Sequence, residues 1–235
     1  KSLGSYHVVP RRWVLESNGG GMGYSLSLMA RMLFPDAPEP ELRLLAEAAQ
    51  SEAGAAGMLS TMGAEVMNMR APSMPMGHLT LSHMAGAHDP APRRHLARAL
   101  VEGCACGVRA NLEQLDTVLA PGLGGTNPAF ITLCGGMSRS AVFGQLLANI
   151  VAREVVVPLT HQTSALGAAI CAAVATGDYP DFASACQALC HVRTRLSAQE
   201  EHAAVNGQLY ATWSRFREQA EISTVPIAVD HLLPR

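Results

Sequence analysis

The chain has 235 residues, of which 49% are hydrophobic and 15% charged, and its formal net charge at pH 7 is −2. A chain of this length can bury a substantial core, and the composition is that of a folded globular protein. No cluster of lysine or arginine stands out, so neither nucleic acid nor an anionic membrane is expected as a partner. No apolar run is long enough to cross a bilayer, and no signal peptide is recognised at the start.

The six cysteines lie in apolar stretches, which suits reduced thiols in a cytoplasmic protein. Cys104 and Cys106 are spaced too closely for a C-x-x-C redox motif. Cys186 and Cys190, four residues apart, have no second pair of ligands nearby in the sequence. We therefore expect no metal site.

Short strands and amphipathic helices alternate in the first half of the chain. The glycines at 19–23 are no dinucleotide fingerprint, because no strand–helix–strand unit with a ribose-binding acid follows them. The predicted elements are a hairpin of strands at 6–9 and 13–16, a turn at 18–23, helices at 24–34 and 41–52, a strand at 57–62, and an irregular stretch at 63–86 with one short strand at 78–82.

The second half begins with the clearest helix, predicted at 92–119 from apolar residues that recur on one face. Beyond it, strands and helices alternate in the order expected of a mixed sheet flanked by helices. The predicted elements are strands at 129–134 and 155–157, helices at 138–152, 163–176, 182–190 and 197–221, and a tail at 222–235.

The predicted strand at 129–134 ends at the pair Gly135-Gly136. A helix follows, and Ser138 is expected to cap it. Glycines here leave backbone amides open beside a helix N-terminus, where a nucleotide can approach. The same pattern also occurs as a plain packing turn. A later run, Ala165-Leu166-Gly167-Ala168-Ala169, predicts a helix with a small-residue surface that another helix or a ligand can approach closely.

The order of these motifs resembles the C-terminal domain of the FGGY carbohydrate kinases. The motifs that carry the resemblance are Gly135-Gly136-Met137-Ser138-Arg139-Ser140, Gln145-Leu146-Leu147-Ala148-Asn149, the strand Glu154-Val155-Val156-Val157-Pro158, and Ala165-Leu166-Gly167-Ala168-Ala169. The resemblance runs from about residue 5 to 190. It implies an α/β, ribonuclease-H-like domain of the actin/hexokinase/heat-shock ATPase superfamily at 1–221, with its first strands missing and a tail at 222–235.

The resemblance also implies which residues would hold a nucleotide. Gly135 and Gly136 match the glycines that pass close to adenosine, and Ser140 matches a residue offered to the adenine edge. Gln145 would face the nucleotide side of its helix, and Gly23 matches a glycine before an apolar helix that lines the cleft. For Gly23 a simple helix-entry turn accounts for the pattern equally well.

By the same resemblance, the parent protein would transfer the γ-phosphate of ATP, with Mg²⁺, to a hydroxyl of a pentulose, polyol or related sugar. The catalytic aspartate and the sugar site would lie in an N-terminal domain, so this chain alone should be inactive. Asn149 and Gln162 stand where the family usually has acids, and the stretch at 63–86 departs from the family's pattern. These departures favour an alternative: a non-catalytic, actin-like binding or regulatory module. An α/β hydrolase or an oxidoreductase is not supported, because no nucleophile elbow or dinucleotide fingerprint is present.

If the first strands of the domain are absent, one edge of the sheet is left without a partner strand. Unpaired sheet edges pair readily with other chains. We therefore expect a homo-oligomer.

Overall fold

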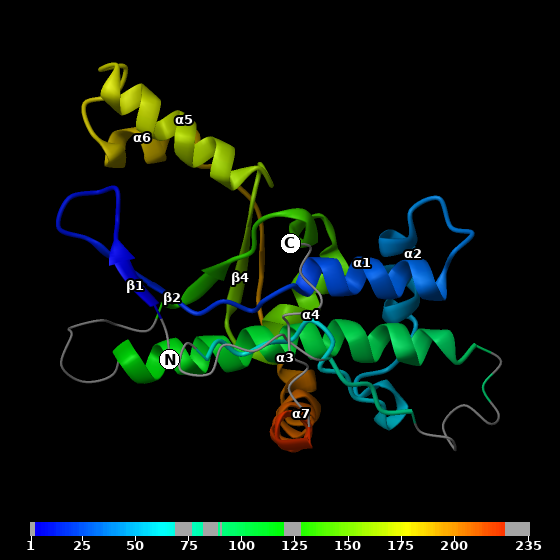
Figure 1. The fold of residues 1–235 in the computed structure, drawn as a ribbon. Coiled ribbons are helices and arrows are strands. Elements are labelled where there is room, and N and C mark those ends of the chain that lie inside the picture. Colours follow the sequence, from blue (N-terminus) through cyan, green and yellow to red (C-terminus); the bar gives the residue numbers. More distant parts are fainter. Residues whose placement is uncertain (1–2, 69–76, 82–88, 90, 120–127, 224–235) are drawn as a thin grey trace, which may run out of the picture.

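A computed structural model describes residues 3–68, 77–81, 89, 91–119 and 128–223 of the chain (Figure 1). Its elements alternate between α-helices and short strands, as an α/β protein requires. In chain order they are β1 (Leu3–Tyr6), β2 (Trp13–Glu16), α1 (Met22–Leu33), α2 (Pro40–Ala49), the 3₁₀ turn η1 (Ala55–Gly57), α3 (Arg93–Leu119), β3 (Phe130–Thr132), η2 (Gly136–Arg139), α4 (Ala141–Val151), β4 (Glu154–Pro158), α5 (Thr163–Ala175), α6 (Phe182–Leu189), β5 (Val192–Leu196), η3 (Glu200–His202) and α7 (Ala203–Ser223).

Two small sheets form within the described residues. β1 and β2 make an antiparallel hairpin. In the three-stranded sheet β4 is central: it runs parallel to β3, with Ile131 opposite Val155, and antiparallel to β5, with Val156 opposite Arg195. Val155, Val156 and Val157 are buried, whereas β5 is largely exposed. The expected mixed sheet flanked by helices is confirmed.

The long helix α3 is the centre of the core, with α1, α2, α4 and α7 packed around it (Figure 1). Two of its glycines allow the segment 60–64 to cross it closely. A Cβ atom at Gly103 would lie 2.2 Å from the backbone oxygen of Ser60, and one at Gly107 would lie 2.9 Å from Cα of Ala64. The absence of side chains at both positions is therefore what lets this segment pack on α3.

The crossing segment is held from its other side by α7. Trp213 is 1% exposed, and its indole Nε1 donates a hydrogen bond of 2.8 Å to the same Ser60 oxygen. Arg109 of α3 adds a second link. Its guanidinium lies 3.9 Å from the centre of the Tyr210 ring and donates to the carbonyl of Ile150 in α4. The last helix is thus part of the core.

Helices α5 and α6 form a hairpin that projects away from this core (Figure 1). Asp181 begins α6 by accepting a hydrogen bond from the backbone N–H of Ser184, which is N-terminal capping. On α5, Ala165, Gly167 and Ala168 are exposed. The predicted small-residue surface is therefore present and open.

Several predicted boundaries and elements were wrong. The first strand is at 3–6 instead of 6–9, because residues 7–12 form the turn. The predicted strand at 57–62 is replaced by η1 and one isolated bridge between Ser60 and Leu79, since the chain makes a left-handed turn at 54–57. Of the strand predicted at 78–82, residue 82 lies outside the described residues, and 78–81 form only the same bridge.

The region after residue 190 also differs from the prediction. β5 was not predicted, and the final helix begins at Ala203 after η3 instead of at 197. Helix α7 continues to Ser223, and the rest of the predicted tail lies outside the described residues.

Candidate functional site

The Gly135–Gly136 turn follows β3 directly and faces open space. Gly135 has φ 76° and ψ −161°, a backbone conformation that is essentially restricted to glycine. Both glycines are exposed, and a Cβ built on either would have no atom within 4 Å. The backbone of the turn is therefore open to solvent, and no side chain of this turn blocks it.

Two serines shape this turn, and the one that caps the following helix is Ser140, whereas the prediction was Ser138. Ser138 is 5% exposed and its hydroxyl donates to the carbonyl of Gly135 at 2.7 Å, so it holds the turn. Ser140 is the N-cap of α4, because its Oγ accepts from the backbone N–H of Phe143 at 3.1 Å. The expectation that Ser138 caps the helix was wrong, because η2 moves the start of α4 to Ala141.

The end of the neighbouring parallel strand, β4, forms the other side of the site. Its loop is tied to the glycine turn by a hydrogen bond from Gly135 N to the carbonyl of His161, and Arg139 Nη2 lies 2.6 Å from Nε2 of His161. Gln162 is the N-cap position of α5, but no side chain caps that helix. Neither 133–140 nor 159–165 contains an acidic residue. The two loops are therefore electropositive and suited to an anion such as phosphate.

Gln145 and Asn149 point toward the segment that follows β5. The Gln145 amide nitrogen donates to Oδ1 of Asn149 and to the carbonyl of Ser197. Asn149 in turn accepts from the backbone N–H of Gln199 and donates to its side-chain oxygen, both at 2.9 Å. A nucleotide contact from Gln145 would thus be limited to its carbonyl oxygen.

Gly23 lies in the first turn of α1 and is exposed, with no atom within 4 Å of a Cβ built on it. No hydrogen bond among the described residues joins it to the Gly135–Gly136 turn. The structure therefore brings Gly135, Gly136 and Ser140 together, and leaves Gly23 as an open position on another element.

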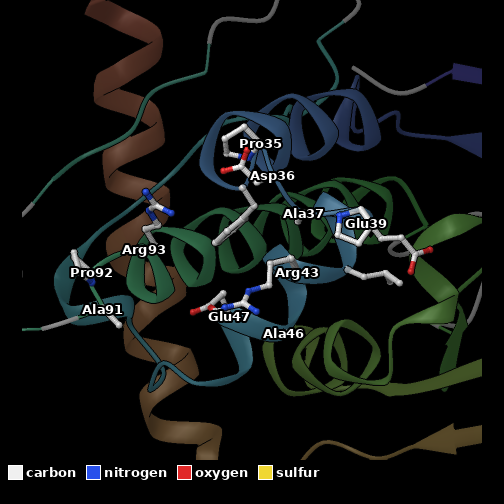
Figure 2. A pocket seen from close by; sticks show the side chains of 13 residues that line it. Pro35, Asp36, Ala37, Glu39, Arg43, Ala46, Glu47, Ala91, Pro92 and Arg93 are labelled. Atoms are coloured by element: carbon white, nitrogen blue, oxygen red, sulfur yellow. Dashed lines mark hydrogen bonds and ion pairs between the residues drawn. The ribbon is translucent and has the colours of Figure 1, made fainter.

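Two hollows lie elsewhere on the molecule. The larger, of about 900 Å³, lies between the α1–α2 connection and the start of α3 (Figure 2). Its walls carry Asp36 and Arg93, together with an ion pair between Arg43 and Glu47 of α2. The smaller, of about 440 Å³, lies beside the left-handed turn at 54–57. None of the five predicted nucleotide residues lines either hollow.

Sequence reasoning missed one cluster of chemically versatile side chains, at the corner between α2 and α3. Ser51 Oγ lies 2.8 Å from Nδ1 of His95, whose Nε2 bonds to the carboxylate of Asp89. Ser51 is only 6% exposed and does not line the adjacent hollow, so its hydroxyl is not offered to a substrate. This cluster joins two helices, and no sequence spacing signals it, since its members lie 44 and 6 residues apart.

The described part of the chain has neither a cluster of metal-binding side chains nor a membrane-spanning helix. No group of three or more histidine, cysteine, aspartate or glutamate side chains is arranged to hold a metal ion there. No helix in this part combines the length and apolar character needed to cross a bilayer.

Known proteins resemble the chain both in sequence and in structure. It is 36% identical to the gluconokinase of Bacillus licheniformis over 104 residues, 44% of this chain and 18% of that protein. It is 27% identical to the autoinducer-2 kinase of Photorhabdus laumondii over 222 residues, 88% of this chain and 39% of that protein. The chain thus spans well under half the length of these relatives.

Among solved structures, the xylulose kinase of Rhodospirillum rubrum superposes with a TM-score of 0.72 at 26% identity, covering 94% of this chain and 42% of the kinase. The ADP-bound glycerol kinase of Plasmodium falciparum superposes with a TM-score of 0.70 at 17% identity, covering 96% and 42%, which shows a shared fold. Residues 12–176 match the C-terminal domain of the FGGY carbohydrate kinases, so the chain belongs to this family and has its actin/hexokinase-like fold.

Proposed function

We propose that this chain is the nucleotide-binding domain of a sugar kinase, and that it holds the adenosine and α-phosphate of ATP against the Gly135–Gly136 turn. The observation that carries the proposal is the open glycine turn at the end of β3, fastened to the end of the parallel strand β4 through His161. Ligands of open α/β sheets bind at the carboxyl ends of such strands.

The chemistry of the surrounding loops supports the same assignment. Arg139 and His161 lie within hydrogen-bonding distance beside the turn, and the uncapped start of α5 adds backbone amides. These groups attract a phosphate. Ser140, in the same turn, would contact the adenine base. When Mg²⁺ accompanies the nucleotide, it offsets the negative charge of the phosphates.

The parent enzyme would then carry an N-terminal domain with the catalytic aspartate and the sugar site. The sugar would be a pentulose, a polyol or a related compound, and the reaction would take place in the cytoplasm. Closure of the two domains over the substrates would exclude water. This chain contributes no catalytic residue in the proposal, so it should not phosphorylate a sugar alone.

Replacing Gly136 by arginine should abolish nucleotide binding and leave the fold intact. The position is exposed and open, so the new side chain fits sterically but occupies the space where adenosine would lie. Calorimetric titration of the full-length protein with ATP, ADP and adenosine measures the effect.

Gly207→Arg is the matched control, because Gly207 is also exposed with open space around it, but lies on α7. We expect this variant to bind as the parent does. If Gly136→Arg bound ATP as tightly as the parent, the assignment of the turn would be wrong.

One of the reasons for the alternative, a non-catalytic module, has a local explanation. Asn149 lies nine residues beyond Ser140 on α4, about 13 Å along the helix axis, and its amide serves the β5–η3 connection. An uncharged residue at this position is therefore explained by local hydrogen bonding. Gln162, in contrast, does lie beside the proposed site.

The proposal also predicts self-association when this chain is studied alone. β3 pairs with β4 on one side, and its other edge has no partner strand among the described residues. Such an edge offers a row of backbone donors and acceptors to a second copy. Sedimentation should therefore show a dimer or a larger species, whereas a monomer at high concentration would contradict this prediction.

A further inference from the structure

Two thiols lie side by side at the exposed end of α6. Cys186 and Cys190 are both free and exposed, and the backbone N–H of Cys190 donates to the carbonyl of Cys186 at 2.8 Å. This i to i−4 bond keeps the two residues one helical turn apart, so their side chains share a face. Both side chains are exposed, and the α5–α6 hairpin that carries them projects from the core (Figure 1).

The two side chains also contact each other. The thiol of Cys186 is a hydrogen-bonding neighbour of the thiol of Cys190. The other cysteines differ: Cys104 and Cys106 are completely buried, and burial raises the pKa of Cys104 to about 12. Within the described residues, only Cys186 on α6 and Cys190 at its C-cap therefore combine exposure with a neighbouring thiol.

The helix fixes the distance between the two thiols, and this distance limits what they can bind. Residues at i and i+4 have their Cβ atoms about 5–6 Å apart, whereas a disulfide needs about 3.5–4.5 Å. A direct disulfide would thus require the backbone to move, but one atom placed between the two sulfurs spans the gap. A tetrahedral zinc site needs further ligands, and no group of three occurs among the described residues.

We propose that Cys186 and Cys190 form a two-thiolate site for a soft monovalent metal ion of the Cu(I) class. Soft thiolates select such ions, and Cu(I) accepts two ligands without a completed tetrahedron. On binding, each thiol loses one proton to solvent and each sulfur donates one electron pair to the metal, with no change of oxidation state. The bound ion would link the last full turn of α6 to its C-cap residue, Cys190.

The test is an anaerobic titration of the fully reduced protein with Cu(I), in competition with a colorimetric Cu(I) chelator. We expect one Cu(I) per chain, held by a site that Cys186→Ser or Cys190→Ser removes. Each variant loses a direct ligand, so its affinity should fall by more than the roughly 10–100-fold typical when a residue that only supports a ligand is changed.

Cys134→Ser and Cys171→Ser are the controls, since both residues are partly buried single thiols, one between β3 and η2 and the other on α5. They should retain the affinity of the parent. Circular dichroism should show that all four variants are folded, because serine replaces a thiol of similar size. Unchanged Cu(I) affinity in both α6 variants, or an equal loss in the Cys171 variant, would overturn the proposal.

Discussion

Trp213→Ala should lower the free energy of unfolding by about 3–5 kcal/mol, as expected when a fully buried aromatic ring is truncated. The ring is 1% exposed, and its N–H is bonded to the oxygen of Ser60, which is itself completely buried. The truncation therefore creates a cavity and also leaves a buried carbonyl without its donor. Urea denaturation followed by circular dichroism measures the change.

The second tryptophan of the chain provides the control, because Trp13 is 67% exposed on the β1–β2 hairpin. Trp13→Ala should have little effect on stability, since almost no apolar burial is lost. Trp213→Phe separates the two contributions by keeping a ring and removing the donor. If both variants of Trp213 were as stable as the parent, α7 would not be part of the core as described.

Gly103→Ala should destabilise the protein by about 1–3 kcal/mol or more, although the same change usually stabilises a helix by about 1 kcal/mol. The added Cβ would lie 2.2 Å from the Ser60 oxygen, so the backbone at residue 60 must move. Gly207→Ala on α7 meets no atom within 4 Å and should follow the usual rule. Opposite signs for the two variants, measured by urea denaturation, would confirm the crossing.

The two predictions share one atom, and they should therefore not be additive. Displacing the Ser60 oxygen breaks the bond that Trp213 makes to it, so the double variant should lose less than the sum of the single losses. Full additivity would show that the two substitutions act on separate contacts.

Sequence patterns predicted an element correctly where buried residues recur at a regular spacing along it. The apolar stripe of α3 predicted a helix at 92–119, and the structure has it at 93–119. β5 has no such pattern: Arg193, Thr194 and Arg195 are exposed, and the strand exists because it pairs with β4. A strand that is stabilised by pairing with a neighbour, and not by burial, has no alternation of apolar residues by which it could be predicted.

In the candidate site, too, some features could be predicted from the sequence and others could not. Gly135 could be predicted because only glycine adopts its backbone conformation, and that requirement is visible in one residue. The roles of Ser138 and Ser140 could not, since they depend on the inserted 3₁₀ turn. The bond between Asn149 and Gln199 joins residues 50 positions apart, and no local pattern reports such a contact.

The bond between Trp213 and Ser60 spans 153 positions, which has a consequence for how the protein is made. Ribosomes add about 5–20 residues per second, so Trp213 is synthesised roughly 8 to 30 s after Ser60. In the part of that interval that follows the synthesis of Leu119, α3 is complete but has no α7 to cover it. Final closure of the core must wait until α7 has been synthesised, so apolar surface that α7 later covers is exposed to aggregation during these seconds.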